Sequence, residues 1–201
     1  ILQRSLSVFH LQSSGQRQST DRKIQGNMSE FLQGQLRPHP LSKDFSCLQL
    51  WTPTSDPRVV VVVLDRSRKR NAISTTMWKE IGRVFSVLGT NGEDWRWSLL
   101  MGAGTKAFTS GIDVSDPAFG LASGTDEADV ARRGLRFYPQ ILEMQRCFTQ
   151  LEECPVPVIA AIQGSCIGAG IDLASACDIR LCSTTTTFSV KEVKIGLAAD
   201  V

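Results

Sequence analysis

Histidine is almost absent from the 201-residue chain, which contains only His10 and His39, both within the first 43 residues. The rest of the chain therefore cannot build a Ser–His or Cys–His nucleophile from its own residues. The six cysteines form no CxxC pair and have no neighbouring histidine, so the spacing of a zinc site is also lacking. Scattered apolar cysteines indicate reduced core residues, and acid–base chemistry would have to use carboxylates.

Long apolar runs and strong charge are lacking as well. The longest apolar run extends only from Val59 to Leu64, whereas a membrane-spanning helix needs about 20 residues. The net charge is +2, and because the N-terminal segment is basic, residues 44–201 are slightly acidic and have no aromatic-laced basic surface. Gly102-Ala103-Gly104 lacks the rest of a dinucleotide fingerprint. We expect neither a membrane span nor a nucleic-acid partner.

Acidic residues are missing from the first twenty positions, where Arg4 and Arg17 stand among serine, glutamine and apolar residues. This composition is typical of a mitochondrial transit peptide, and a disordered tail without an address is the alternative. Residues 12–43 are polar and show no helical or alternating period, which indicates a linker. We therefore predict a targeting peptide or disordered linker over residues 1–43 and one domain over residues 44–201.

In that domain, short apolar runs alternate with helical patterns. The predicted strands cover residues 45–51, 59–64, 95–102, 158–162, 178–182 and 187–190. The predicted helices cover residues 74–89, with Ser74 as N-cap, 126–154, started or kinked by Pro139, and 172–177. Residues 103–124 are predicted to be a loop. Strands that alternate with helices imply an α/β fold with largely parallel pairing.

The stretch from Val158 to Cys177 reads as strand, glycine turn and helix, and the start of such a helix can stabilise an oxygen that gains charge. Asp172, Glu192 and Asp200 then follow, a combination that suggests proton transfer beside a carbonyl. Each acid alone has an ordinary explanation. Asp172 suits a first helical turn, Glu192 in VKEVK suits a solvated strand, and Asp200 could be an N-cap.

A basic turn directly follows the predicted strand at residues 59–64. It contains Arg66, Arg68, Lys69 and Arg70. Such a cluster is suited to the phosphates of a ligand, and a solvated turn is the alternative.

These segments resemble a known family. KAFTSGIDV and CPVPVIAAIQGSCIGAGIDLASACDIRLC resemble the two signatures of the crotonase (enoyl-CoA hydratase/isomerase) superfamily, and DRSRKRNAIS resembles its early phosphate-side turn. The resemblance spans residues 46–201 and implies a crotonase-like spiral of ββα units, with the C-terminal helical part missing and the domain at 44–201 incomplete. It also implies a homotrimer or homohexamer at full length. Together with the N-terminal composition, it leads us to expect the mitochondrial matrix as the compartment, with the peroxisome as an additional one.

The resemblance assigns roles to residues of both glycine loops. The backbone N–H groups of Ile112 and Ala169 would form an oxyanion hole for an acyl-CoA thioester, although glycine is commoner than Ala169 at the second position. The CoA path would be lined by Ser110, Gly111, Ile112, Asp113 and Val114, and its phosphates would lie near Arg66, Arg68 and Arg70. No metal and no separate cofactor are implied, because CoA is part of the substrate.

The three acids indicate a branch of the superfamily. A hydratase is expected to carry glutamates at positions 172 and 192 and a small residue at position 200. Asp172, Glu192 and Asp200 instead resemble the branch that isomerises 3,5-dienoyl-CoA to 2,4-dienoyl-CoA, in which the residues matching Glu192 and Asp200 shuttle the proton and Asp172 supports them. An enoyl-CoA hydratase and a catalytically inactive, truncated CoA-binding fragment are the alternatives.

Overall fold

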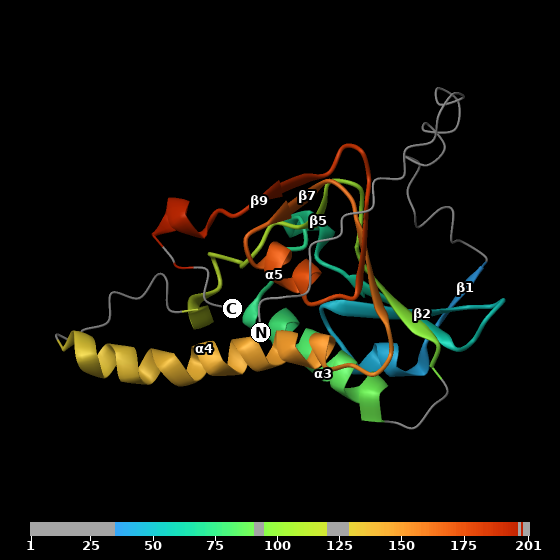
Figure 1. The fold of residues 1–201 in the computed structure, drawn as a ribbon, viewed down its shortest axis with the longest axis horizontal. Coiled ribbons are helices and arrows are strands. Elements are labelled where there is room, and N and C mark those ends of the chain that lie inside the picture. Colours follow the sequence, from blue (N-terminus) through green and yellow to red (C-terminus); the bar gives the residue numbers. More distant parts are fainter. Residues whose placement is uncertain (1–34, 91–94, 120–128, 197, 199–201) are drawn as a thin grey trace.

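The computed structural model describes residues 35–90, 95–119, 129–196 and 198 (Figure 1). The strands are β1 (Leu36–Pro38), β2 (Leu48–Pro53), β3 (Val59–Leu64), β4 (Trp97–Gly102), β5 (Ala107–Thr109), β6 (Val158–Ile162), β7 (Ser165–Ile167), β8 (Ile179–Cys182) and β9 (Thr187–Ser189). The α-helices are α3 (Thr75–Thr90), α4 (Val130–Glu152) and α5 (Ala169–Ser175). Short 3-10 turns are η1 (Pro40–Asp44), η2 (Ser67–Lys69), η3 (Pro117–Phe119) and η4 (Glu192–Ile195).

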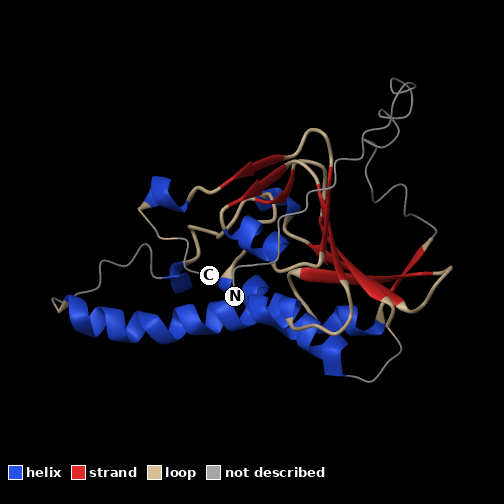
Figure 2. Cartoon of the chain, in the orientation of Figure 1, coloured by secondary structure: helices blue, strands red, loops and turns tan. Residues whose placement is uncertain are grey.

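The strands form two sheets (Figure 2). The larger sheet has the order β1-β2-β3-β4-β6-β8; its first pairings are antiparallel, and those from β3 to β8 are parallel. The smaller sheet has the order β5-β7-β9 and is parallel throughout. Parallel neighbours need long crossovers, and α3 and α4 lie in two of these connections. The expected mixed α/β architecture is therefore present.

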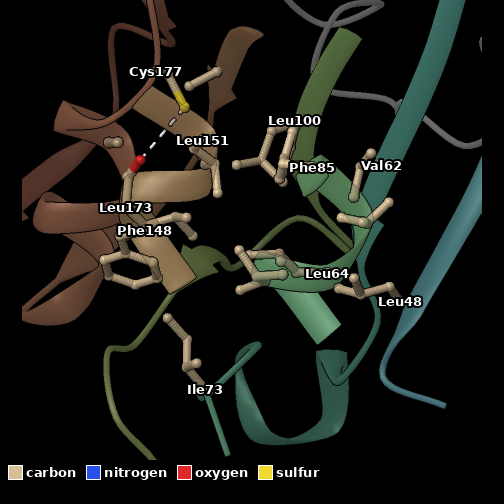
Figure 3. Packing of buried hydrophobic residues seen from close by; sticks show 14 of the residues in the cluster. Leu48, Val62, Leu64, Ile73, Phe85, Leu100, Phe148, Leu151, Leu173 and Cys177 are labelled. Atoms are coloured by element: carbon tan, nitrogen blue, oxygen red, sulfur yellow. Dashed lines mark hydrogen bonds between the residues drawn. The ribbon is translucent and has the colours of Figure 1, made fainter. Parts of the chain in front are cut away.

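The core lies between the larger sheet and the helices. Helix α3 turns one buried face inward, including Trp78, Ile81 and Phe85. The Trp78 ring stacks on Phe148 of α4 at a centroid distance of 4.5 Å, and its Nε1 donates to the Met144 carbonyl at 2.9 Å. Figure 3 shows the packing of the cluster to which β2, β3, β4, α4 and α5 all contribute. This core fixes the helices against the sheet from which the site loops emerge.

Several predicted elements are confirmed nearly to the residue. The strands β3 and β6 have the predicted bounds, because both are short buried apolar runs. Helix α3 begins at Thr75, and the Ser74 hydroxyl oxygen accepts the Met77 N–H at 3.2 Å, as expected of an N-cap. Helix α4 begins at Val130, so Pro139 lies inside the helix and does not start it.

Three strands arise where no strand was predicted. The strands β5 and β7 have three residues each and lie in segments that were predicted as a loop and a glycine turn. Strand β1 lies within the predicted linker, where Pro38 is tolerated because β1 is an edge strand. His39, next to β1, packs against Trp95 at a ring-centroid distance of 5.4 Å, so this part of the segment joins the fold.

The six cysteines are free, as predicted, and Cys166 and Cys177 are buried. Burial raises the pKa of the Cys177 thiol to about 12, so this group stays protonated. Among the helices of the described residues, none combines the length and the apolar character that crossing a bilayer requires.

Candidate active site

Three chemistry-bearing segments leave one edge of the smaller sheet. Because β5, β7 and β9 are parallel neighbours, their carboxyl ends lie at the same edge. The first loop, residues 110–114, follows β5; the second loop, residues 168–170, follows β7; and Glu192 lies shortly after β9. Ligands of open α/β sheets bind outside such carboxyl ends. The topology thus brings together segments that are up to 82 positions apart in the sequence, from Ser110 to Glu192.

The first and second loops are in direct contact. Gly111 has a φ of 85°, and a Cβ there would lie 2.7 Å from the carbonyl oxygen of Ile167, which immediately precedes the second loop. A Cβ on Gly170 would overlap the methyl group of Thr109. The two loops can approach this closely only because both positions lack a side chain.

Glu192 faces the second loop. Gly168 has a φ of 55°, and a Cβ on it would lie 2.8 Å from Oε1 of Glu192. The Gly168 N–H donates to the Ser189 carbonyl at 2.9 Å and so ties the end of β9 to this loop. The Oε2 atom of Glu192 is buried and has no hydrogen-bond partner among the described residues. A buried carboxylate oxygen of this kind is costly unless something else, such as a substrate, contacts it.

The Ile112 amide points away from the backbone segment at Ile73, which lies beside it. Ile73 and Ile112 form a parallel bridge, in which the Ile73 N–H donates to the Gly111 carbonyl at 2.8 Å and the Asp113 N–H donates to the Ile73 carbonyl at 2.9 Å. The Gly111 carbonyl and the Ile112 N–H belong to one trans peptide group, in which the two bonds point in opposite directions. The N–H of Ile112 is therefore directed to the opposite side.

Ala169 is the first residue of α5, after Gly168 at the N-cap. The N–H groups of a first helical turn have no acceptor within the helix. The amides of Ile112 and Ala169 thus belong to two touching loops. The Ile112 N–H is directed away from Ile73, and the Ala169 N–H has no acceptor within α5. An oxyanion hole needs two such donors aimed at one oxygen, so the pairing of these amides stays a prediction.

Asp172 lies in the first turn of α5 and is half-buried. Burial and, after it, the charge of Asp172 raise the pKa of the Cys166 thiol in β7 to about 12. Asp172 follows the second loop by two positions, and its part in the chemistry stays a prediction. Asp200 lies outside the described residues.

The basic turn contacts the first loop. Arg66 Nη2 donates to Oδ2 of Asp113 at 2.8 Å, and Lys69 Nζ donates to the same oxygen at 3.1 Å. The Ser110 N–H donates to the Arg70 carbonyl at 3.0 Å. Arg66 is largely enclosed and committed to Asp113, whereas the side chains of Arg68, Arg70 and Val114 are exposed. The basic turn, predicted to lie near the CoA phosphates, and the first loop, predicted to line the CoA path, are thus neighbours. Their enclosed charged side chains, Arg66 and Asp113, pair with each other.

Asn71 was not singled out in the sequence, although it joins the basic turn to the first loop. It is fully buried and adopts a φ of 54°. Its side chain accepts the Arg66 N–H at 3.1 Å and donates to the Ala103 and Ala107 carbonyls at 2.9 and 3.0 Å. Its carbonyl accepts the Thr109 hydroxyl at 2.6 Å. An asparagine beside a basic turn was the available signal, since asparagine tolerates left-handed backbone.

The substitution Asn71→Ala is expected to lower the free energy of unfolding by about 3 kcal/mol, because it leaves buried carbonyls without donors and puts alanine in left-handed backbone. Urea denaturation measures the loss. Arg68→Ala, on the exposed side of the same turn, is the control and should change stability by less than about 0.5 kcal/mol. Equal, small effects of the two substitutions would show that the Asn71 bonds do not support the turn.

Asp113 is expected to make stability depend on pH. Burial, the largest influence, raises its pKa, but hydrogen bonds from Ser115, Arg66 and Lys69 together bring it well below the usual 3.8. The stabilisation is thus fully present above the unfolded-state pKa and is lost as the pH falls toward the folded-state pKa. Asp113→Asn should cost about 2 kcal/mol at pH 7 and much less at pH 2. Urea denaturation at both pH values tests this, and a cost independent of pH would contradict it.

No group of three or more histidine, cysteine, aspartate or glutamate side chains that could hold a metal ion occurs in the described part of the chain. The site as described therefore offers amide donors and carboxylates. This chemistry suits the stabilisation of an enolate oxygen beside a group that accepts or returns a proton.

The fold and the paired glycine loops define a protein of the crotonase class. The family model for enoyl-CoA hydratase/isomerase matches residues 54–201. The chain belongs to the enoyl-CoA hydratase/isomerase family, and the resemblance noted in the sequence is confirmed.

Similar proteins include the mitochondrial Delta(3,5)-Delta(2,4)-dienoyl-CoA isomerase of Rattus norvegicus, which is 45% identical over 148 residues, covering 74% of this chain and 44% of the relative. The peroxisomal enzyme of the same name from Arabidopsis thaliana is 36% identical over 158 residues, covering 79% of this chain and 56% of the relative. The chain spans about half the length of these curated relatives.

Solved structures of the same fold include an enoyl-CoA hydratase/carnithine racemase from Magnetospirillum magneticum, with a TM-score of 0.63 and 30% identity, covering 77% of this chain and 52% of that one. A protein from Thermobifida fusca, described as an enoyl-CoA hydratase in complex with acetoacetyl-CoA, has a TM-score of 0.63 and 31% identity, covering 80% of this chain and 61% of that one. The crotonase-like fold is therefore confirmed.

Proposed function

We propose that the chain carries the thioester site of a dienoyl-CoA isomerase of fatty-acid β-oxidation, which converts a 3,5-dienoyl-CoA to its 2,4 isomer. The observation that carries the proposal is the position of Glu192, whose Oε1 lies only 2.8 Å from the point that a Cβ on Gly168 would occupy. A carboxylate is thereby adjacent to Ala169, one of the two amides proposed to bind the thioester oxygen. The names of the curated relatives support the choice of reaction.

The double-bond shift removes one proton from the acyl chain and returns one, so that substrate and product have the same composition. Carbon C2 of the acyl chain loses a proton, the electrons delocalise onto the thioester oxygen as an enolate, and carbon C6 gains a proton. Two carboxyl groups are needed, one as base and one as acid. We assign these roles to Glu192 and Asp200, with Asp172 supporting them through its charge. CoA is part of the substrate, and the proposal includes no further cofactor.

In this proposal, the amides of Ile112 and Ala169 lower the energy of the enolate. A thioester enolate is too high in energy to form readily in water, but each aimed N–H donor can stabilise it by about 3 kcal/mol. The CoA portion would extend along the first loop, which contacts the basic turn. Its phosphates would then meet the exposed Arg68 and Arg70.

Water addition to a 2-enoyl-CoA is the alternative reaction, because solved structures of the same fold are described as enoyl-CoA hydratases. Asp172, where a hydratase is expected to carry glutamate, favours the isomerase. For the compartment we propose the mitochondrial matrix, on the basis of the mitochondrial relatives, with the peroxisome as the alternative. A homotrimer or homohexamer of the full-length protein stays a prediction.

The test is to incubate the 201-residue chain separately with a 3,5-dienoyl-CoA and a 2-enoyl-CoA and to follow the ultraviolet absorbance of each. Isomerisation that exceeds hydration supports the proposal. Faster hydration would identify a hydratase. Binding of acyl-CoA without turnover would identify an inactive CoA-binding fragment.

A further inference from the structure

Arg66 spans the backbone bridge that orients the Ile112 amide. Its Nη1 donates to the Ala72 carbonyl, just before Ile73, and its Nη2 donates to Oδ2 of Asp113, just after Ile112. The guanidinium therefore contacts both backbone segments of the Ile73–Ile112 bridge. A planar group with fixed donor directions restrains these two segments more strongly than a single contact would.

The carboxylate of Asp113 is occupied on both oxygens. Besides the two cationic donors on Oδ2, the Ser115 N–H and hydroxyl donate to Oδ1 at 3.1 and 2.5 Å. Asp113 is 6% exposed, and the side chain of Arg66 is 21% exposed. Charge-assisted hydrogen bonds between enclosed groups are among the more rigid polar contacts in proteins.

We propose that Arg66 and Asp113 are positioning residues that aim the Ile112 N–H at the thioester oxygen, an inference that rests on the proposed function. The expectation from the sequence was that both residues contact CoA. A phosphate on Arg66 would instead have to compete with the enclosed Asp113 carboxylate. The phosphates are left to Arg68 and Arg70, whose side chains are exposed.

The two roles differ in which part of the ligand they affect. CoA contains the phosphates but has no thioester carbonyl, whereas acetoacetyl-CoA contains both. A positioning residue of the oxyanion hole affects only the ligand with the carbonyl. A phosphate contact affects both ligands equally.

The experiment measures the dissociation constants of CoA and acetoacetyl-CoA for the 201-residue chain by titration calorimetry. Asp113→Asn keeps the shape of the side chain and removes its charge. We expect it to weaken acetoacetyl-CoA about tenfold relative to CoA, whose affinity should stay within about twofold, because a misaimed amide loses much of one donor. Arg66→Met should act likewise, and Arg66→Lys should recover part of the loss. Arg68→Ala is the matched comparison and should weaken both ligands equally.

An equal loss of both ligands in Asp113→Asn and Arg66→Met would place these residues at the phosphates and overturn the inference. A lower melting temperature with unchanged affinity for both ligands would reduce the pair to a structural role and overturn it too. If the unsubstituted chain binds neither ligand, the proposed function itself fails, and the inference fails with it. A selective loss of acetoacetyl-CoA, partly rescued by lysine at position 66, supports the inference.

Discussion

Glu192→Gln is expected to lower the rate of dienoyl-CoA isomerisation by about a thousandfold. Glutamine has nearly the same shape but can neither accept nor return a proton at this position, and general acid–base catalysis typically contributes between about a hundredfold and ten-thousandfold. The Oε2 atom of Glu192 is buried and has no hydrogen-bond partner among the described residues, so the burial of this carboxylate is not explained by a structural contact there. The ultraviolet absorbance change of a 3,5-dienoyl-CoA gives the rate.

Glu152→Gln is the matched control for this prediction, because Glu152 is an exposed carboxylate at the end of α4. Its rate should equal that of the unsubstituted chain. Affinity for CoA should be nearly unchanged in both variants, since neither carboxylate lies in the basic turn. Isomerisation by Glu192→Gln at more than a tenth of the normal rate would remove Glu192 from the proton transfer.

Gly168→Ala is expected to reduce isomerisation about a hundredfold or more. The new methyl group would lie 2.8 Å from Oε1 of Glu192, and the φ of 55° is strained for alanine. Glu192 would have to withdraw, or the loop would have to shift and turn the Ala169 amide. Loss of one oxyanion-hole donor alone lowers rates by about a hundredfold to a thousandfold.

Gly134→Ala makes the same chemical change in α4, where a Cβ meets nothing within 4 Å. It should leave the rate unchanged and increase helix stability by about 0.5 to 1 kcal/mol. Comparison of the two variants at equal folded fraction separates the effect on the site from the general effect of alanine. Normal turnover in Gly168→Ala would contradict the proposed contact between Glu192 and the second loop.

The elements that could be predicted from the sequence are those that carry their own apolar pattern. The six-residue run of β3 and the helical spacing of α3 bury side chains in the main core, so local sequence and tertiary packing agree. The strands β5 and β7 have three residues each and exist mainly through their pairing with neighbours. Such pairing is a long-range property that a short segment does not reveal.

The place of Glu192 shows the same limit. The alternation of VKEVK is typical of a solvated strand, yet the segment forms the 3-10 turn η4 and Glu192 is half-buried. Parallel pairing of β7 and β9 brings it to Gly168, and local charge alternation contains no information about that pairing. The role proposed for Glu192 comes from the resemblance to the crotonase superfamily and not from the local pattern.

The basic turn was assigned to phosphate as a cluster, but its members have different surroundings. Arg66 pairs with Asp113, which is 47 positions away in the sequence, whereas Arg68 remains exposed. A run of like charges does not disclose which member finds an internal partner. That distinction depends on the register by which the first loop packs against the turn.

A crystal structure of the chain with acetoacetyl-CoA tests the central claim most directly. We expect the thioester oxygen about 3 Å from the amide nitrogens of both Ile112 and Ala169, with the Glu192 carboxylate against the acyl chain. A thioester bound away from the two loops, or Glu192 turned into solvent beyond reach of the acyl carbons, would contradict it.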